Sequence, residues 1–116
     1  MTADVQHHLP VSPAVLEILV ALGGAPLHGY AVAQAVRARS GGRIRLETGP
    51  LYRHLKRLLD DSLVAEAPRP EDDDARRGAY YRLTPLGRRV LAAESRRLGD
   101  LVAHVREAGL APELGR

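Results

Sequence analysis

Residues 48–59 have the sequence TGPLYRHLKRLL, in which the leucines recur at helical spacing. The intervals i, i+4, i+7 and i+8 place Leu51, Leu55, Leu58 and Leu59 on one stripe, which is typical of a helix that packs on a core. Thr48-Gly49-Pro50 is a cap-and-proline helix start, and Asp60-Asp61-Ser62 ends the run. The other side carries Tyr52, Arg53, Lys56 and Arg57. The pattern predicts a helix with one apolar face and one basic face.

Two helices are predicted before this one. The first begins at Pro13, after the N-cap Ser12, and stops at Gly23-Gly24. The second begins near residues 27–30 and ends at residues 40–42. Residues 1–11 are expected to form a short polar arm, and residues 43–46 alternate between polar and apolar, which predicts a short strand.

A hairpin and a long helix are predicted after residue 62. Residues 63–67 and 79–83 are strand candidates, and the segment between them is polar. Thr84-Pro85 starts a helix expected from about Leu86 to Glu107. The fold class is therefore mainly α with a small β-hairpin: a winged helix-turn-helix (residues 12–84) followed by a C-terminal dimerisation helix (residues 85–108).

Composition excludes several classes of protein. A chain of 116 residues is expected to form one domain, and the absence of cysteine excludes disulfides and cysteine-based zinc sites. No apolar run reaches about 20 residues and residues 1–10 do not resemble a secretion signal, so we expect a cytoplasmic protein with no membrane association.

The basic residues are concentrated in the centre of the chain. Residues 28–57 contain seven Arg and Lys side chains and a single acidic one, a net charge of +6, whereas the remainder is slightly acidic. Almost all of the basic residues are Arg, which binds phosphate and guanine in a bidentate manner. The charge distribution favours double-stranded DNA as partner, although an Arg-rich genome would also produce part of this signal.

Candidate DNA contacts follow from the predicted positions. Thr48 and Tyr52 would donate hydrogen bonds to phosphates, and Arg53 and Lys56 would reach base edges. Further candidates are Arg57 beside them, Arg43 and Arg45 before the helix, and Arg76 and Arg77 at the hairpin tip. The acidic run at residues 71–74 counts against DNA contacts at the hairpin tip. For the helix, the simpler alternative is a solvated face with Tyr52 partly packed.

The long helix carries an apolar stripe that one small domain does not readily cover. It consists of Leu91, Leu98, Leu101, Val102 and Val105. Pairing with a second copy would bury the stripe and place two recognition helices about one DNA turn apart, roughly 34 Å. The alternative is that the helix folds back on its own domain.

No enzyme, cofactor or metal site is predicted. The histidines are scattered, there is no phosphate-binding glycine loop or nucleophile elbow, and Asp100 with His104 supplies only two potential ligands. Without Trp or Phe an aromatic cage for an effector is not expected, whereas an aliphatic pocket along the long helix remains possible.

Three motifs together resemble the PadR family of bacterial transcriptional regulators, in its short form with a single C-terminal helix. They are LHGY at residues 27–30, GPLYRHLKRL at residues 49–58 and YYRLTPLG at residues 80–87. The resemblance implies a homodimeric DNA-binding repressor, often released by a small-molecule or stress signal. We therefore expect a sequence-specific regulator acting on a palindromic operator, with a possible small-molecule effector of unknown identity.

Three alternatives stay open. A MarR-like regulator shares the LTPLG stretch, although such dimers generally need an N-terminal helix and few residues precede Pro13. An adaptor would bind an acidic protein through the same basic face. A ligand-sequestering protein would have no affinity for DNA.

Overall fold

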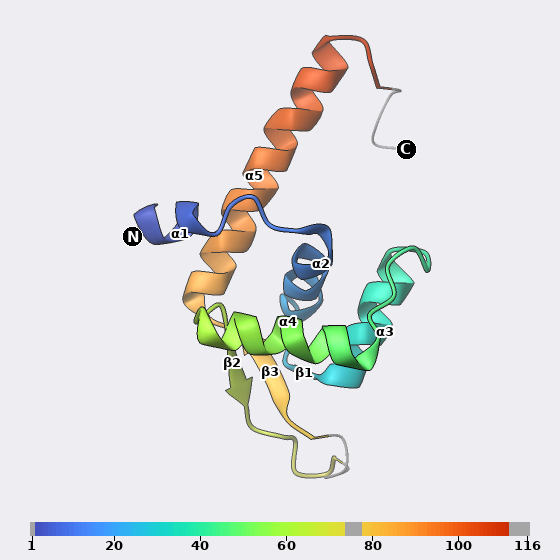
Figure 1. Ribbon diagram of the computed structural model, residues 1–116, viewed down its shortest axis with the longest axis vertical. Helices are drawn as coiled ribbons and strands as arrows, with labels where there is room; N and C mark the ends of the chain where they lie inside the picture. The colour runs from blue at the N-terminus through green and yellow to red at the C-terminus, as the bar shows by residue number, and fades with distance from the viewer. Residues whose placement is uncertain (1, 74–77, 112–116) are drawn as a thin grey trace.

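The computed structural model describes residues 2–73 and 78–111. The predicted order of helices, hairpin and long helix is confirmed, with the second half of α5 extending away from the other elements (Figure 1). The elements are α1 (Thr2–His7), α2 (Pro13–Leu22), β1 (Leu27–His28), α3 (Gly29–Arg39), α4 (Thr48–Asp60), β2 (Val64–Ala67), β3 (Tyr80–Leu83) and α5 (Pro85–Glu107).

Two of the predicted cap-and-proline starts form as expected. The Ser12 side chain accepts a hydrogen bond from the Val15 amide at 3.4 Å, and Thr84 Oγ1 accepts one from the Gly87 amide at 3.0 Å. The third start differs, because the N-cap of α4 is Glu47, which makes no side-chain capping bond, and Thr48 is the first helical residue. The Thr48 hydroxyl is therefore exposed on the first turn of α4 rather than used as a cap.

The sheet has one strand more than the predicted hairpin. Its order is β1-β3-β2, with both pairs antiparallel. β1 pairs Leu27 with Tyr81 and His28 with Tyr80, so it joins the start of α3 to the wing strands. A strand of two residues is too short to show alternation, and the sequence pattern therefore did not reveal it.

Two further expectations need correction. Residues 43–46 form no strand; instead, the Ile44 amide donates to Ser40 Oγ at 2.9 Å, and Ile44 and Leu46 pack against the core. Their alternation reflects two inward side chains on an irregular segment. The N-terminal arm contains helix α1, whose Val5 is buried in the core.

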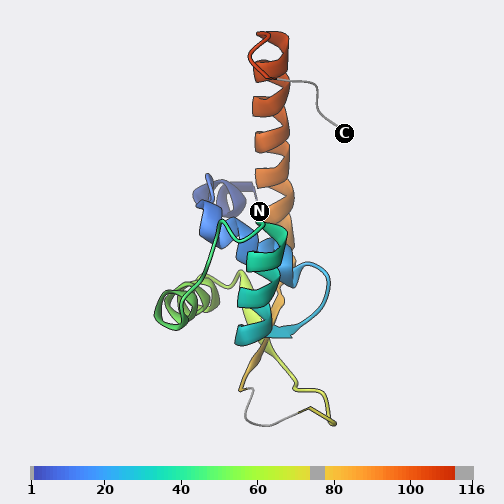
Figure 2. The same ribbon diagram turned by 90° about the vertical axis from the view of Figure 1, so that its right-hand side faces the viewer.

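The core lies between α2, α3, α4, the sheet and the first half of α5. Val90 of α5 is fully buried, and the backbone of Gly87 lies against the carbonyl group of Leu63. The first turns of α5 thus complete the winged domain, and the second half of the helix projects beyond it (Figure 2).

A buried carboxylate attaches the N-terminal segment to α5. Glu94 is only 1% exposed and accepts hydrogen bonds from Arg97 at 2.7 and 2.9 Å and from the Val11 amide at 3.1 Å. The hydrogen bonds from Arg97 hold the pKa of Glu94 below its ordinary value, against the opposing effect of burial, and the Val11 amide adds to this effect. Glu94 is therefore a charged structural link rather than a member of the apolar stripe.

Candidate nucleic-acid interface

Helix α4 presents the two faces that the sequence predicts. Leu51, Leu55 and Leu58 are buried, and the side chains opposite them are exposed. The exposed set comprises Thr48, Tyr52, Arg53, Lys56 and Arg57. Since the apolar stripe anchors the helix to the core, its outward face is available to enter a major groove.

The basic side chains of α4 differ in their partners. Lys56 Nζ lies 3.4 Å from an Asp60 carboxylate oxygen, and Arg57 Nε lies 3.5 Å from one of Asp61. Among residues 2–73 and 78–111, no carboxylate lies within ion-pair distance of Arg53. Arg53 therefore carries the least compensated charge on this face.

Tyr52 is both packed and exposed. Its ring lies against Gly29 at the first turn of α3, yet 44% of the residue remains accessible. Burial raises the pKa of Tyr81, and the neighbouring Tyr52 hydroxyl and Glu66 carboxylate raise it further. Tyr52 thus sets the approach of α4 to α3, while its partial exposure is compatible with the predicted phosphate contact.

The LHGY motif joins three parts of this surface. The buried His28 caps α3, because its Nδ1 accepts a hydrogen bond from the Ala31 amide at 3.2 Å. Its ring also makes an edge contact with Tyr80 of β3, with the centroids 5.3 Å apart. Together with the packing of Tyr52 on Gly29, these contacts give α3, α4 and the wing one fixed arrangement.

The wing is described only in part. Arg76 and Arg77, the predicted tip contacts, lie outside the described residues. On the near side of the tip, Asp73 accepts a hydrogen bond from the Tyr80 hydroxyl at 2.5 Å. This bond ties one carboxylate of the acidic run back to β3. Arg82 on β3 is exposed and is a further cation beside the wing that the sequence pattern did not indicate.

Arg43 is exposed on the segment between α3 and α4, as expected for a side chain available to phosphate. The same segment and α3 contribute two more arginines, Arg37 and Arg45, to a groove beside the first turn of α4. Arg37 was not selected from the sequence, because its proximity to α4 arises only from the tertiary fold.

The apolar stripe of α5 falls into two parts. Leu91 packs against the protomer's own core. Beyond the buried Glu94, Leu98 and Val105 are half-buried, Leu101 is 51% exposed and Val102 is 39% exposed. The part of the stripe available to a second copy therefore begins at Leu98.

Other kinds of site find no counterpart in the described part of the chain. It contains no group of three or more His, Cys, Asp or Glu side chains arranged to hold a metal ion. None of its helices combines the length and apolar character needed to cross a membrane. Its two prominent cavities are lined by α3 with α4 and by the N-terminal segment with α4, and neither is lined by α5.

The fold and the basic outward face of α4 define a winged-helix DNA-binding protein. The model of the Transcriptional regulator PadR-like family matches residues 18–93, about two thirds of the chain. The chain therefore belongs to the PadR-like family, whose members are transcriptional regulators rather than enzymes. This is the family that the sequence motifs predict.

The chain is also similar to one relative in sequence and to two solved structures. The chain is 37% identical over 101 residues to an uncharacterized 37.1 kDa protein in transposon TN4556 of Streptomyces fradiae, a match that covers 87% of this chain and 27% of that protein. The chain thus spans about a quarter of the length of this curated relative.

The solved structures share the fold at low sequence identity. A PadR family transcription regulator from Clostridium difficile superposes with a TM-score of 0.68 at 21% identity, over 83% of this chain and 97% of that one. A transcriptional regulator from Clostridium thermocellum gives a TM-score of 0.66 at 17% identity, over 90% of this chain and 96% of that one.

Proposed function

We propose that the chain is a repressor that binds a palindromic operator as a homodimer. The observation that carries this proposal is the outward face of α4, where Arg53 has no carboxylate partner within the described residues. An uncompensated arginine on an exposed helix anchored by a leucine stripe is suited to bidentate contact with guanine in a major groove.

Each candidate side chain has a distinct role in this proposal. Arg53 and Lys56 read base edges, whereas Thr48 and Tyr52 donate hydrogen bonds to phosphates and fix the position of the helix. The remaining contacts, all to the backbone, are assigned to Arg43, Arg57, Arg76 and Arg77. The last two extend the interface along the wing, next to the acidic residues that must turn away from DNA.

The dimer is proposed from the exposed distal half of α5. Leu101 and Val102 are apolar and accessible, and the half-buried Leu98 and Val105 continue the same stripe. Burying this stripe against its copy would stabilise the pair through the hydrophobic effect. A two-fold axis along α5 would present two α4 helices to half-sites roughly 34 Å apart, which requires a palindromic operator.

Repression needs only that the promoter be occupied, and a dimer bound to an operator within the promoter would occupy it. A small-molecule effector, which the family resemblance implies, would act by changing the separation of the two α4 helices. We place its expected site along α5 between two copies, since α5 lines neither of the two prominent cavities in the described part of the chain.

The test is fluorescence anisotropy of the protein on DNA from upstream of its own gene, with unrelated DNA of equal length as control. We expect binding to the upstream DNA to be about 10³-fold tighter and to persist between about 50 and about 200 mM salt. Equal, salt-sensitive binding to both DNAs would contradict sequence-specific regulation. Transcription in vitro from the bound promoter should fall as the protein is added, and a rise would contradict repression.

A further inference from the structure

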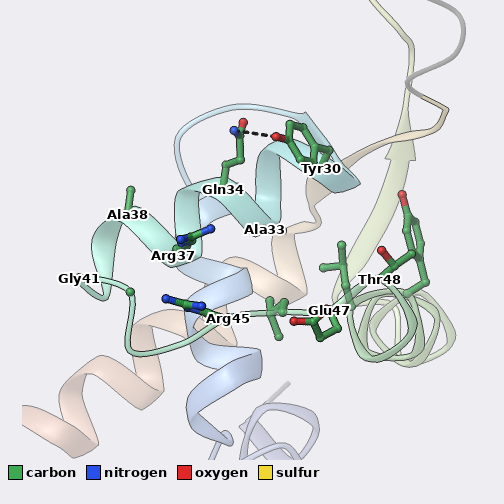
Figure 3. Close-up of a pocket in the computed structure, with 13 residues that line it drawn as sticks. Tyr30, Ala33, Gln34, Arg37, Ala38, Gly41, Arg45, Glu47 and Thr48 are labelled. Atoms are coloured by element: carbon green, nitrogen blue, oxygen red, sulfur yellow. Dashed lines mark hydrogen bonds between the residues drawn. The ribbon is translucent and has the colours of Figure 1, made fainter.

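A groove of about 730 Å³ lies between α3 and the first turn of α4. The irregular segment that joins the two helices closes one end of it (Figure 3). Its polar lining comprises Tyr30, Gln34, Arg37, Arg45, Glu47, Thr48 and Tyr52. The groove therefore adjoins the outward face of α4 and shares Thr48 and Tyr52 with it.

Two arginines enter this groove from different segments. Arg37 comes from the last turn of α3 and Arg45 from the connecting segment, and both are exposed (Figure 3). Within residues 2–73 and 78–111, neither guanidinium has a carboxylate at ion-pair distance. Arg39, on the same helix as Arg37, is by contrast held by Glu17 through hydrogen bonds of 2.8 and 2.6 Å.

Electrostatics favours an anion between these two side chains. Two guanidinium groups lining one groove repel each other, and an oxyanion between them replaces that repulsion with charge-assisted hydrogen bonds. The helix dipole accounts for a cation at the C-terminal end of α3, but it does not account for Arg45. Arg also matches the geometry of phosphate better than Lys does.

The other polar residues that line the groove determine how strongly it would bind an anion. The Gln34 amide donates to the Tyr30 hydroxyl at 3.1 Å, and the exposed hydroxyl of Thr48 lies at the α4 side of the groove. Glu47 is the single acidic residue among those lining the groove, and it opposes an anion there. Its side chain makes no capping bond, so its charge can be removed without losing one.

We propose that this groove seats a phosphate of the DNA backbone between Arg37 and Arg45. The inference rests on the proposed DNA-binding function and adds to it. In a helix-turn-helix, the helix before the recognition helix crosses the backbone that flanks the major groove. A phosphate in this seat fixes the depth and register of α4, so that its outward side chains meet the base edges, and it carries no sequence information itself.

The test compares two double variants with equal loss of charge. Arg37→Gln/Arg45→Gln removes the seat, and Arg89→Gln/Arg96→Gln removes two exposed charges from α5, which does not line the groove. The seat variant should bind operator and unrelated DNA roughly tenfold more weakly than the control variant. The slope of log K against log salt should be shallower by about one, because one phosphate contact is lost. Melting temperatures should match, since the exposed arginines make no described side-chain hydrogen bond.

A variant of opposite sign completes the test. Glu47→Gln should tighten binding to both DNAs by roughly threefold, because it removes the one lining charge that repels phosphate. Titration with inorganic phosphate distinguishes a DNA phosphate from a small free anion. Weak, millimolar binding of inorganic phosphate agrees with a seat for the backbone.

The outcomes separate this inference from the function on which it rests. If the seat variant has the affinity and salt slope of the control variant, the groove is not a phosphate seat, although the wild-type protein still binds its operator. The inference is also overturned if the wild-type protein binds inorganic phosphate tightly while the seat variant keeps the salt slope of the control variant on DNA. The groove would then be a site for a small free anion. Failure of the wild-type protein to bind any DNA would instead overturn the proposed function.

Discussion

The ring of Tyr52 packs on the backbone of Gly29, so closely that a Cβ atom at Gly29 would lie 2.8 Å from Cζ of Tyr52. This contact joins the recognition helix to the first turn of α3. Gly29 is thus required for the approach of the two helices. We expect Gly29→Ala to reduce the free energy of unfolding by about 1–3 kcal/mol, because the added methyl group overpacks the contact.

The position of α4 should change as well. Displacing Tyr52 from Gly29 moves a side chain proposed to position the helix on DNA, so the affinity for the operator should fall with stability. Urea unfolding and anisotropy measure the two effects. Gly24→Ala is the matched control, since a Cβ at Gly24 meets nothing within 4 Å. A second change, Tyr52→Leu in the Gly29→Ala background, should restore part of the lost stability. If the two substitutions instead lower the free energy of unfolding additively, the added methyl group does not act through its contact with Tyr52.

The elements that the sequence predicted correctly are those determined by local interactions. Proline after a capping residue defines the starts of α2 and α5, and the leucine period defines the inner face of α4. The outward placement of Arg53 and Lys56 follows from the same period.

What the sequence did not reveal depends on contacts between distant residues. β1 exists because Leu27 and His28 pair with β3, more than fifty positions along the chain. The groove between α3 and α4 likewise depends on how the connecting segment folds. The alternation at residues 43–46 was misleading because Ile44 and Leu46 turn inward without any strand partner.

Gly87 should be among the positions most sensitive to substitution. A Cβ there would lie 3.1 Å from the carbonyl carbon of Leu63 and closer still to its oxygen, and backbone cannot rotate away as a side chain can. We expect Gly87→Ala to lower the free energy of unfolding by about 2 kcal/mol or more, despite the better helix propensity of alanine.

Gly99 provides the matched control on the same helix. Its Cβ would meet nothing within 4 Å, so Gly99→Ala should stabilise α5 by about 0.5–1 kcal/mol. Thermal or urea unfolding of the two variants under identical conditions compares them. Equal stability of both variants would show that the Gly87 contact is not restrictive.

Glu94 should make the stability of the protein dependent on pH in the acidic range. Its folded-state pKa lies below the ordinary value of 4.5, chiefly because of the hydrogen bonds from Arg97. A group with a lowered pKa contributes stability above its unfolded-state pKa, and this contribution is lost as the pH falls through the folded-state value. Glu94→Gln should therefore melt roughly 5 °C below wild type at pH 7.

The difference between the two proteins should shrink as the pH falls below about 4.5, where the carboxyl group begins to protonate in the unfolded chain. Melting curves of both proteins from pH 7 to about pH 3 measure this. If the difference in melting temperature stays constant across that range, the substitution destabilises the protein by disturbing packing and not by removing the charge of Glu94.

The distal half of α5 should determine the oligomeric state. Leu101 is half exposed in the single chain, so Leu101→Glu should leave the protomer folded while it places a charge in the proposed interface. Leu98→Glu should have the same effect. Light scattering should report monomers for both variants and a dimer for wild type.

Ala103→Glu is the control for added charge on this helix, since Ala103 is exposed and lies on the other side of α5 from the stripe. It should leave the dimer intact. Dimers that persist in both leucine variants would mean that α5 does not form the interface, and monomeric wild-type protein would exclude the dimer itself.

Arg53 should contribute more to sequence discrimination than any other side chain of α4. Arg53→Gln is expected to weaken operator binding by about 1–3 kcal/mol, roughly fivefold to 150-fold, with a much smaller effect on unrelated DNA. For Lys56→Gln, the loss of affinity should differ less between operator and unrelated DNA. Asp60 lies 3.4 Å from Lys56 Nζ and already offsets part of its charge. Anisotropy titrations of both variants on both DNAs measure the ratio. If Arg53→Gln weakens binding to the two DNAs equally, Arg53 contacts a phosphate. The contacts with the bases must then be assigned to another side chain on this face.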